Sequence, residues 1–362
     1  MKSLLRLLLK TQYQENRYDP PETEKGMTLI ELLIGMVIAF LIITPMLAFV
    51  VDMLNTDRRE QVKSNTEQDI QAAVDFIAQD LSQAIYIYDN NPTLVSTPTT
   101  TATGIAALTN FIPPQTPNET PILVFWKRQQ LKNSLPVNTA LTAQPKNCNP
   151  EAKPNQAGEC NDIYVLALVA YYEIRETNPN SIWCQPSGSP CPTRIVRYQI
   201  QDGVRDNNSI NPNPLQRYFT DLNPGQDRSP AFNPGFDLTK PTQNVTLNQA
   251  WGSPEVLVNY VHHSIANLPV PDPAECQTAL GNPSITTGIT PTPILETTLR
   301  IPAPGNVNSF YACVDTARNL ARVTIRGNSL RRIQTDADYA QSKSAFFPTA
   351  SVQVQGLGGV GK

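Results

Sequence analysis

The chain has 362 residues, of which 40% are apolar, and a formal net charge of -3. This length allows one or two domains, and the lack of any Lys- and Arg-rich block interleaved with aromatic residues argues against nucleic-acid binding. Only Pro20, Pro21 and Pro45 of the 33 prolines precede residue 91, so the composition predicts a helical first part followed by strands and long irregular loops.

An uncharged apolar stretch runs from residue 32 to residue 51 (LLIGMVIAFLIITPMLAFVV). At a rise of about 1.5 Å per residue it spans about 30 Å, the hydrocarbon thickness of a bilayer. The basic residues that precede it are Lys2, Arg6, Lys10, Arg17 and Lys25. This bias predicts a single-pass protein of the inner membrane, with residues 1–26 in the cytoplasm and a periplasmic C-terminal part. An ordinary secretory signal fits poorly, because the candidate cut lies ahead of the apolar run.

Glu31 lies at the beginning of the apolar run, where an unpaired carboxylate is costly in lipid. A charged residue in this setting indicates a functional site and requires a partner. Cleavage after Gly26 would create one, the new α-amino group of Met27, on the same chain or on a neighbouring subunit of a fibre. The alternative is a glutamate at the membrane edge whose side chain reaches the interface.

The string from Lys25 to Leu33 reads KGMTLIELL. It closely resembles the prepilin peptidase site of type IV pilins and of type II secretion pseudopilins, although the usual first mature residue there is Phe. The resemblance implies that a prepilin peptidase removes residues 1–26 as a leader and that Met27 becomes N-methylated. It also implies that Glu31 guides assembly with other pilins or pseudopilins on an inner-membrane assembly platform.

Pro45 lies inside the apolar run. A proline removes one backbone hydrogen bond and tends to kink a helix, which a membrane helix tolerates. Pilins often carry a proline in this region, where the helix can loosen within a filament. A kink without a mechanical role is the alternative.

Residues 52–88 contain no Pro or Gly, and their apolar residues recur at spacings of three and four. The apolar stripe comprises Ile70, Val74, Ile77, Leu81, Ala84, Ile85 and Tyr88, and the polar face between its members comprises Glu67, Asp69, Asp75, Gln79 and Asp80. The sequence Asp-Asn-Asn-Pro at 89–92 predicts the end of this helix. We therefore expect a transmembrane and assembly helix over residues 27–51 that continues as an amphipathic helix over residues 52–90.

The rest of the chain predicts an extracytoplasmic head over residues 91–345, with long Pro-rich loops. Strands are predicted at residues 121–127, 162–175, 194–201, 255–265, 310–315 and 320–326. Residues 316–319 join the last two segments as a hairpin. An antiparallel sheet packed on the amphipathic helix gives an α+β, pilin-like fold. The Gly-rich end predicts a flexible tail over residues 346–362.

Six cysteines lie in the predicted head, which suits an oxidising compartment, although six cysteines allow fifteen pairings. Proximity in the sequence favours disulfides between Cys148 and Cys160 and between Cys184 and Cys191. Cys276 and Cys313 then remain as the third pair. The alternative is that some of them are buried thiols. Zinc is disfavoured because the chain contains no C-x-x-C motif.

Enzymatic chemistry has little support, and no catalytic residue, metal or cofactor is expected. His262 and His263 are adjacent in a predicted strand, so they should point to opposite faces. The segment from Asp202 to Asn208 is rich in oxygen ligands but lacks the EF-hand order, which favours a polar turn. The aromatic residues considered for stacking on sugars are Trp183, Tyr218, Phe219 and Trp251; core or loop packing is the alternative for them.

The order of the strands resembles the larger minor pilins and the J-type pseudopilins of type II secretion. Over residues 25–90 the chain is most similar to the hormogonium polysaccharide secretion pseudopilins of filamentous cyanobacteria. This resemblance implies a minor pilin-like subunit that supports polysaccharide secretion and gliding motility, in contact with membrane lipid. The alternatives are a surface- or polysaccharide-binding module displayed on a fibre, and a J-type pseudopilin of protein secretion.

Overall fold

The structure is a computed structural model that describes residues 26, 28–91, 104–108, 111–113, 116–136, 160–205, 210, 212–213, 218, 231–232, 251–262, 272–287, 290–303, 309–335 and 337–357. The chain divides into two units, Met1–Asp57 and Arg58–Lys362, named here the N-terminal unit and the head unit. All strands of the described residues belong to the head unit.

The long helix α2 (Leu29–Ser82) confirms most of the helix that the sequence predicts. The prediction that the helix continues to residue 90 is wrong, because strand β1 (Ala84–Ile87) follows directly. Residues 85–87 are Ile, Tyr and Ile, which suit a pleated strand, and β1 pairs with a neighbouring strand in antiparallel fashion. The spacing of the apolar residues alone could not distinguish the two outcomes.

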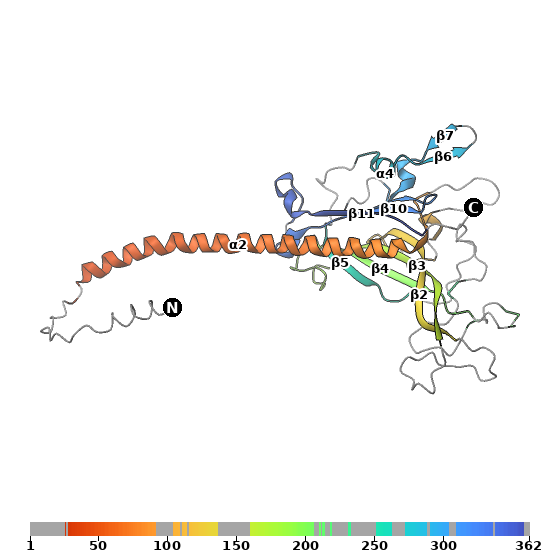
Figure 1. Cartoon of the computed structure of the whole chain (residues 1–362). Helices are drawn as coiled ribbons and strands as arrows, with labels where there is room; N and C mark the ends of the chain where they lie inside the picture. Colours follow the sequence, from red (N-terminus) through yellow and green to blue (C-terminus); the bar gives the residue numbers. More distant parts are fainter. Residues whose placement is uncertain are drawn as a thin grey trace, which may run out of the picture. The chain divides into compact units, whose positions relative to one another are not determined.

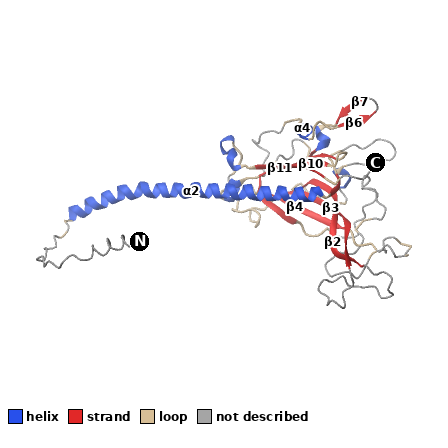
Figure 2. Ribbon diagram, in the orientation of Figure 1, coloured by secondary structure: helices blue, strands red, loops and turns tan. Residues whose placement is uncertain are grey.

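Five antiparallel strands form the larger sheet of the head unit, in the order β1-β2-β3-β4-β5. The strands after β1 are β2 (Glu119–Pro136), β3 (Cys160–Arg175), β4 (Thr193–Gln201) and β5 (Glu255–Val261). Each of these four overlaps a segment that the sequence predicts as a strand. The part of α2 that belongs to the head unit lies along this sheet (Figures 1 and 2).

The second sheet has the order β11-β10-β9-β8. Its strands are β8 (Arg300–Ile301), β9 (Phe310–Asp315), β10 (Leu320–Arg326) and β11 (Thr349–Gln355). The hairpin predicted from β9 and β10 is confirmed, with Leu320 paired to Asp315 next to the turn. Asn319, the last turn residue, has a φ of 50°, a left-handed conformation that Asn adopts more readily than most residues.

Strand β11 corrects the predicted flexible tail over residues 346–362. It pairs with β10 along all of its length, from Thr349 to Gln355. Ala350, Val352 and Val354 alternate with polar residues and pack partly buried against the core, so the period of two was present in the sequence. Residues 358–362 lie outside the described residues.

Short elements complete the described part of the head unit. They are η1 (Ile105–Leu108), α4 (Glu275–Ala279), β6 (Ser284–Thr287), β7 (Thr290–Pro293), α5 (Glu296–Leu299), η3 (Ser329–Arg332) and η4 (Gln341–Phe346). Strands β6 and β7 form a two-stranded ribbon of their own.

One hydrophobic core joins α2 to both sheets. The helix contributes Ile70, Ala73, Val74, Ile77 and Leu81, each at most 1% exposed. Burial of each larger side chain stabilises the fold by about 1.5–3 kcal/mol. At Gly327 an added Cβ would lie 2.3 Å from Cδ1 of Ile70, so the glycine lets α2 approach the end of β10 closely.

Candidate functional site

The N-terminus of α2 is capped by reciprocal contacts between Thr28 and Glu31. The Thr28 backbone N and Oγ1 lie 3.4 and 3.3 Å from Oε2 of Glu31. In return, the Glu31 backbone N–H donates to Oγ1 of Thr28 at 3.4 Å and to its carbonyl at 3.0 Å. This pattern is a capping box, T-x-x-E. Its spacing was visible in the sequence, but Thr28 is not among the predicted site residues.

The cap bears on the predicted role of Glu31. Its side-chain contacts of 3.3–3.4 Å with Thr28 are long for hydrogen bonds to a carboxylate, and Glu31 is exposed. The carboxylate is therefore accessible to a stronger donor from outside. Gly26 is also exposed, and an added Cβ there would meet no atom within 4 Å. Met27, the predicted partner, lies outside the described residues.

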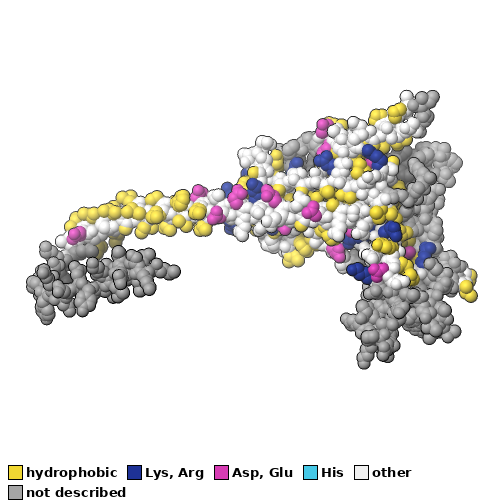
Figure 3. Space-filling model, in the orientation of Figure 1, with side chains coloured by type: hydrophobic (Ala, Val, Ile, Leu, Met, Phe, Trp, Pro, Cys, Tyr) yellow, Lys and Arg dark blue, Asp and Glu magenta, His cyan; other side chains and the backbone are white. Residues whose placement is uncertain are grey.

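The N-terminal unit carries an uncovered apolar surface on α2. Every Leu, Ile, Val, Met and Phe between Leu29 and Leu54 is exposed, with exposed fractions from 49% at Val50 to 84% at Leu29. Hydrophobic side chains cover the face of this part of the helix that Figure 3 shows. The helix is long and apolar enough to cross a membrane. A continuous apolar surface of this kind needs lipid or apolar protein to cover it.

Pro45 lies inside α2, and the helix continues through it. Because proline has no N–H, the carbonyl of Leu41 receives no helical hydrogen bond from it. The hydroxyl of Thr44 donates to the carbonyl of Phe40 at 2.8 Å, so the polar group next to the proline is satisfied within the helix. The predicted loosening at Pro45 stays a prediction.

Two of the three predicted disulfides are confirmed. Cys184 and Cys191 are bonded with their Cα atoms 4.9 Å apart, and Cys276 and Cys313 are bonded with theirs 5.2 Å apart. The second bond attaches α4 to β9. The predicted pair Cys148–Cys160 lies outside the part of the chain whose side chains are described.

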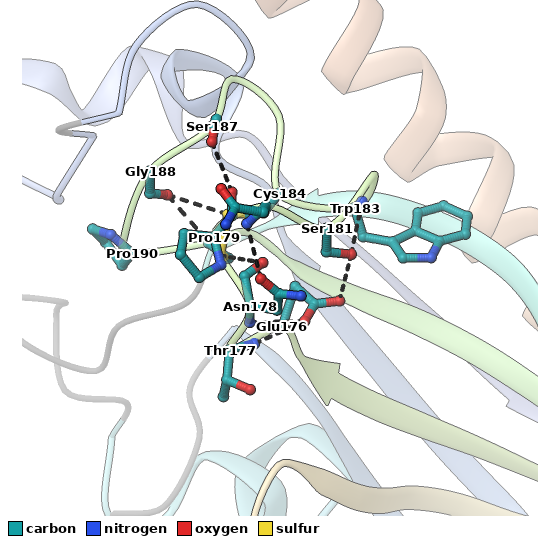
Figure 4. The surroundings of a disulfide bond; sticks show 12 residues. Glu176, Thr177, Asn178, Pro179, Ser181, Trp183, Cys184, Ser187, Gly188 and Pro190 are labelled. Carbon is teal, nitrogen blue, oxygen red and sulfur yellow. Dashed lines mark hydrogen bonds between the residues drawn. A yellow bond between two sulfur atoms is a disulfide. The ribbon is translucent and has the colours of Figure 1, made fainter.

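The loop closed by Cys184 and Cys191 wraps around the guanidinium of Arg331. Nε of Arg331 donates to the carbonyl of Pro190 at 2.8 Å, and Nη2 donates to that of Gly188 at 2.7 Å. Figure 4 shows the loop with the Gly188 carbonyl turned inward and the indole of Trp183 turned away. Arg331 therefore ties the loop to η3, a connection that sequence spacing did not predict.

Asp80, which the sequence places on the polar face of the amphipathic part of α2, is buried in the head unit. It is 7% exposed, and its carboxylate accepts from Nζ of Lys127, Nε of Arg197 and the hydroxyl of Tyr171, each at 2.7 Å. Burial by itself would raise the pKa of Asp80, but Arg197 and Lys127 outweigh it and hold the pKa below its ordinary value. The cluster joins α2 to β2, β3 and β4.

His262 and Asp202, candidates by residue type for catalysis or metal binding, are both held in contacts with neighbouring residues of the head unit. His262 is buried, with Nδ1 3.2 Å from Nδ2 of Asn328, and His263 lies outside the described residues. The carboxylate of Asp202 accepts from the Ala231 backbone N–H and from the Tyr218 hydroxyl, each at 3.1 Å. No group of three or more His, Cys, Asp or Glu in the described residues is placed to hold a metal ion.

The aromatic residues considered for sugar stacking are not arranged as one platform. Trp251 packs against the core and donates from Nε1 to the carbonyl of Phe111 at 3.1 Å. Tyr218 is buried, and Trp183 is half-buried with the Arg194 guanidinium 5.3 Å from its ring centre. Phe219 lies outside the described residues.

Comparisons of the chain with models of protein families, with curated proteins and with solved structures found no match.

Proposed function

We propose that this chain is a minor pilin-like subunit, a pseudopilin, of a type IV pilus-like apparatus that supports polysaccharide secretion and gliding motility. One observation carries the proposal. The string KGMTLIE, residues 25–31, leads into a helix that begins at Leu29 and whose large apolar side chains are all exposed as far as Leu54. The same helix ends in a stretch that packs on antiparallel strands.

The exposed apolar surface requires two successive environments in this proposal. Before assembly, lipid of the inner membrane covers it, with the head in the periplasm; the excess of basic residues before the helix supports that orientation. After extraction from the bilayer, the corresponding helices of neighbouring subunits cover it. Without either cover, the surface would remain in water at a large cost in free energy.

Glu31 provides the register for assembly. Its carboxylate is exposed and held by Thr28 only through long contacts, so a positively charged donor can compete for it. Cleavage after Gly26 gives each subunit such a donor at Met27. A neighbour shifted along the fibre would bring its Met27 amine to Glu31, and the pair would be shielded from water by apolar side chains.

Replacing Gly26 by Ala is expected to stop removal of residues 1–26, because the peptidase must accept the residue before the cut within its active site. Intact-mass spectrometry of the membrane fraction should show the full-length chain, with no species that begins at a methylated Met27. Gly35→Ala is the matched control, since Gly35 also has open space around it but lies inside the helix. Normal processing of Gly26→Ala would contradict the cut site.

Replacing Glu31 by Gln separates charge pairing from helix capping. Gln can close a capping box as Glu does, but it has no charge to attract an amine. We expect Glu31→Gln and Glu31→Ala to be inserted and processed normally, yet to be reduced at least about tenfold in sheared fibres, as loss of a desolvated ion pair implies. Glu60→Gln, farther along the helix, is the control. Wild-type incorporation of Glu31→Gln would show that capping alone is the role.

A further inference from the structure

A polar groove of about 610 Å³ opens in the head unit beside the end of α2. The helix forms one wall, strands β2 and β4 contribute residues from the sheet, and the segment that leads into β5 forms the rim. Amide side chains dominate its lining: Gln79, Gln83, Gln129, Gln199 and Gln201.

The amides gather here because α2 ends before the sheet does. Side chains two apart share a face of a strand, so Gln129 lies on the same face of β2 as Lys127, and Gln199 lies on the same face of β4 as Arg197. Lys127 and Arg197 both reach Asp80 on α2, which identifies this face as the one that the helix covers. Beyond Ser82 the helix no longer covers it.

The charges that line the groove balance one another. Two cationic side chains, Lys127 and Arg197, face two carboxylates, Asp80 and Glu255. Besides its bond to Asp80, Arg197 donates from Nη1 to Glu255 at 3.2 Å and from Nη2 to Gln199. The Arg197 guanidinium is therefore already engaged on all three nitrogens, and a charged ligand would have to break existing pairs to gain one of its own.

The lining matches a ligand rich in hydroxyl groups. A glutamine amide carries two N–H donors and an acceptor, and hydroxyl groups likewise both donate and accept. Within the groove, Oε1 of Gln199 already accepts from Arg197, and Nε2 of Gln129 already donates to the carbonyl of Gln130. Phe76 adds an apolar ring that is 40% exposed, against which the C–H face of a sugar ring can pack. An apolar ligand would desolvate the amides without replacing their hydrogen bonds, at a net cost.

We infer that this groove binds a neutral saccharide chain. The inference goes beyond the role of the chain as a fibre subunit and does not depend on it, because assembly is assigned to Glu31 in the N-terminal unit. It gives the head unit a recognition surface of its own. Because no net charge is involved, binding should depend little on ionic strength.

Titration calorimetry on the full chain in detergent micelles tests the inference. The probes are cellohexaose, maltohexaose and mannohexaose, with hexagalacturonate as the charged comparison. At least one neutral hexasaccharide is expected to bind, with an affinity that changes less than about twofold between 50 and 500 mM NaCl. The Gln129→Ala/Gln201→Ala double variant should weaken binding about tenfold, since each lost hydrogen bond is worth roughly threefold or more in affinity.

Gln68→Ala is the matched control, because Gln68 is exposed on α2 and does not line the groove. Gln83→Ala provides a second, single change at the groove should the double variant fail to fold, which its thermal denaturation would reveal. Three outcomes would overturn the inference. The first is that no neutral probe binds at concentrations up to about 10 mM, which corresponds to a Kd weaker than any useful affinity. The other two are an unchanged affinity in the groove variants, and tighter, strongly salt-dependent binding of hexagalacturonate.

Discussion

Replacing Asp80 by Asn is expected to lower the free energy of unfolding by roughly 3–5 kcal/mol, because it removes the one carboxylate that two buried cations share. Lys127 and Arg197 are 4% and 8% exposed, and both bond to Asp80 at 2.7 Å. Asparagine preserves the shape of the side chain but cancels its charge. Two buried positive charges would then face each other with only Glu255, at the exposed rim, to offset them.

Urea denaturation of the full chain in detergent, followed by tryptophan fluorescence, measures this effect, because Trp126 is completely buried in the same sheet. Asp75→Asn is the matched control: Asp75 is exposed on α2 and bonds to Gln71 at 2.9 Å. The control should change stability by less than about 0.5 kcal/mol. Equal stabilities of the two variants would show that the Asp80 cluster makes no net contribution to the free energy of unfolding.

The Asp80 cluster also predicts a loss of stability in acid. The pKa of Asp80 is lowered in the folded chain, chiefly because Arg197 and Lys127 overcome the effect of burial. A carboxyl group whose folded pKa is depressed stabilises the fold above its unfolded pKa, and this contribution disappears as pH falls through the folded value. The destabilisation caused by Asp80→Asn should therefore begin to shrink as the pH falls below the unfolded pKa of 3.8, and it should disappear only below the folded pKa.

Replacing Glu173 by Gln is expected to stabilise the fold, by an amount that grows as the pH rises above about 4.5. Glu173 lies in β3 and is 1% exposed, and neither carboxyl oxygen has a hydrogen-bond partner among the described residues. Burial raises the pKa of Glu173 to about 8, with Arg175 opposing the shift. The folded chain therefore holds this carboxyl group protonated at pH 7, whereas the unfolded chain ionises it.

The direction in which the free energy of unfolding changes with pH follows from proton binding. Between the unfolded pKa of 4.5 and the folded value of about 8, the folded state binds one more proton than the unfolded state. The free energy of unfolding should therefore fall by about 1.4 kcal/mol per pH unit over this window. Gln is neutral at every pH and nearly isosteric, so Glu173→Gln should match the wild type near pH 4 and exceed it by roughly 4 kcal/mol at pH 8.

Urea denaturation from pH 4 to pH 9 distinguishes this expectation from a simple packing effect. Glu67→Gln serves as the control, because Glu67 is exposed on α2 and its replacement should leave the pH profile unchanged. A stability difference between Glu173→Gln and the wild type that is the same at pH 4 and pH 8 would contradict a raised pKa at Glu173.

Features that depend on consecutive residues could be predicted from the sequence. The uncharged run at residues 32–51 predicts a helix that needs an apolar environment, and α2 exposes that run entirely. Segments rich in β-branched and aromatic residues located β3, β4, β9 and β10, and the short separation of Cys184 and Cys191 indicated their bond. Each of these signals is contained within one segment, so no knowledge of distant neighbours is needed.

Features that depend on distant partners were decided only by the tertiary structure. Asp80 is charged, which by itself favours an exposed position, and its burial is made possible by Lys127 and Arg197, which are 47 and 117 positions away. Residues 84–87 fit a helix or a strand by spacing, and pairing with β2 selected the strand. The amide-lined groove arises because α2 ends before the sheet does. A one-dimensional pattern records which faces are apolar, but only the packed chain determines which polar side chains meet.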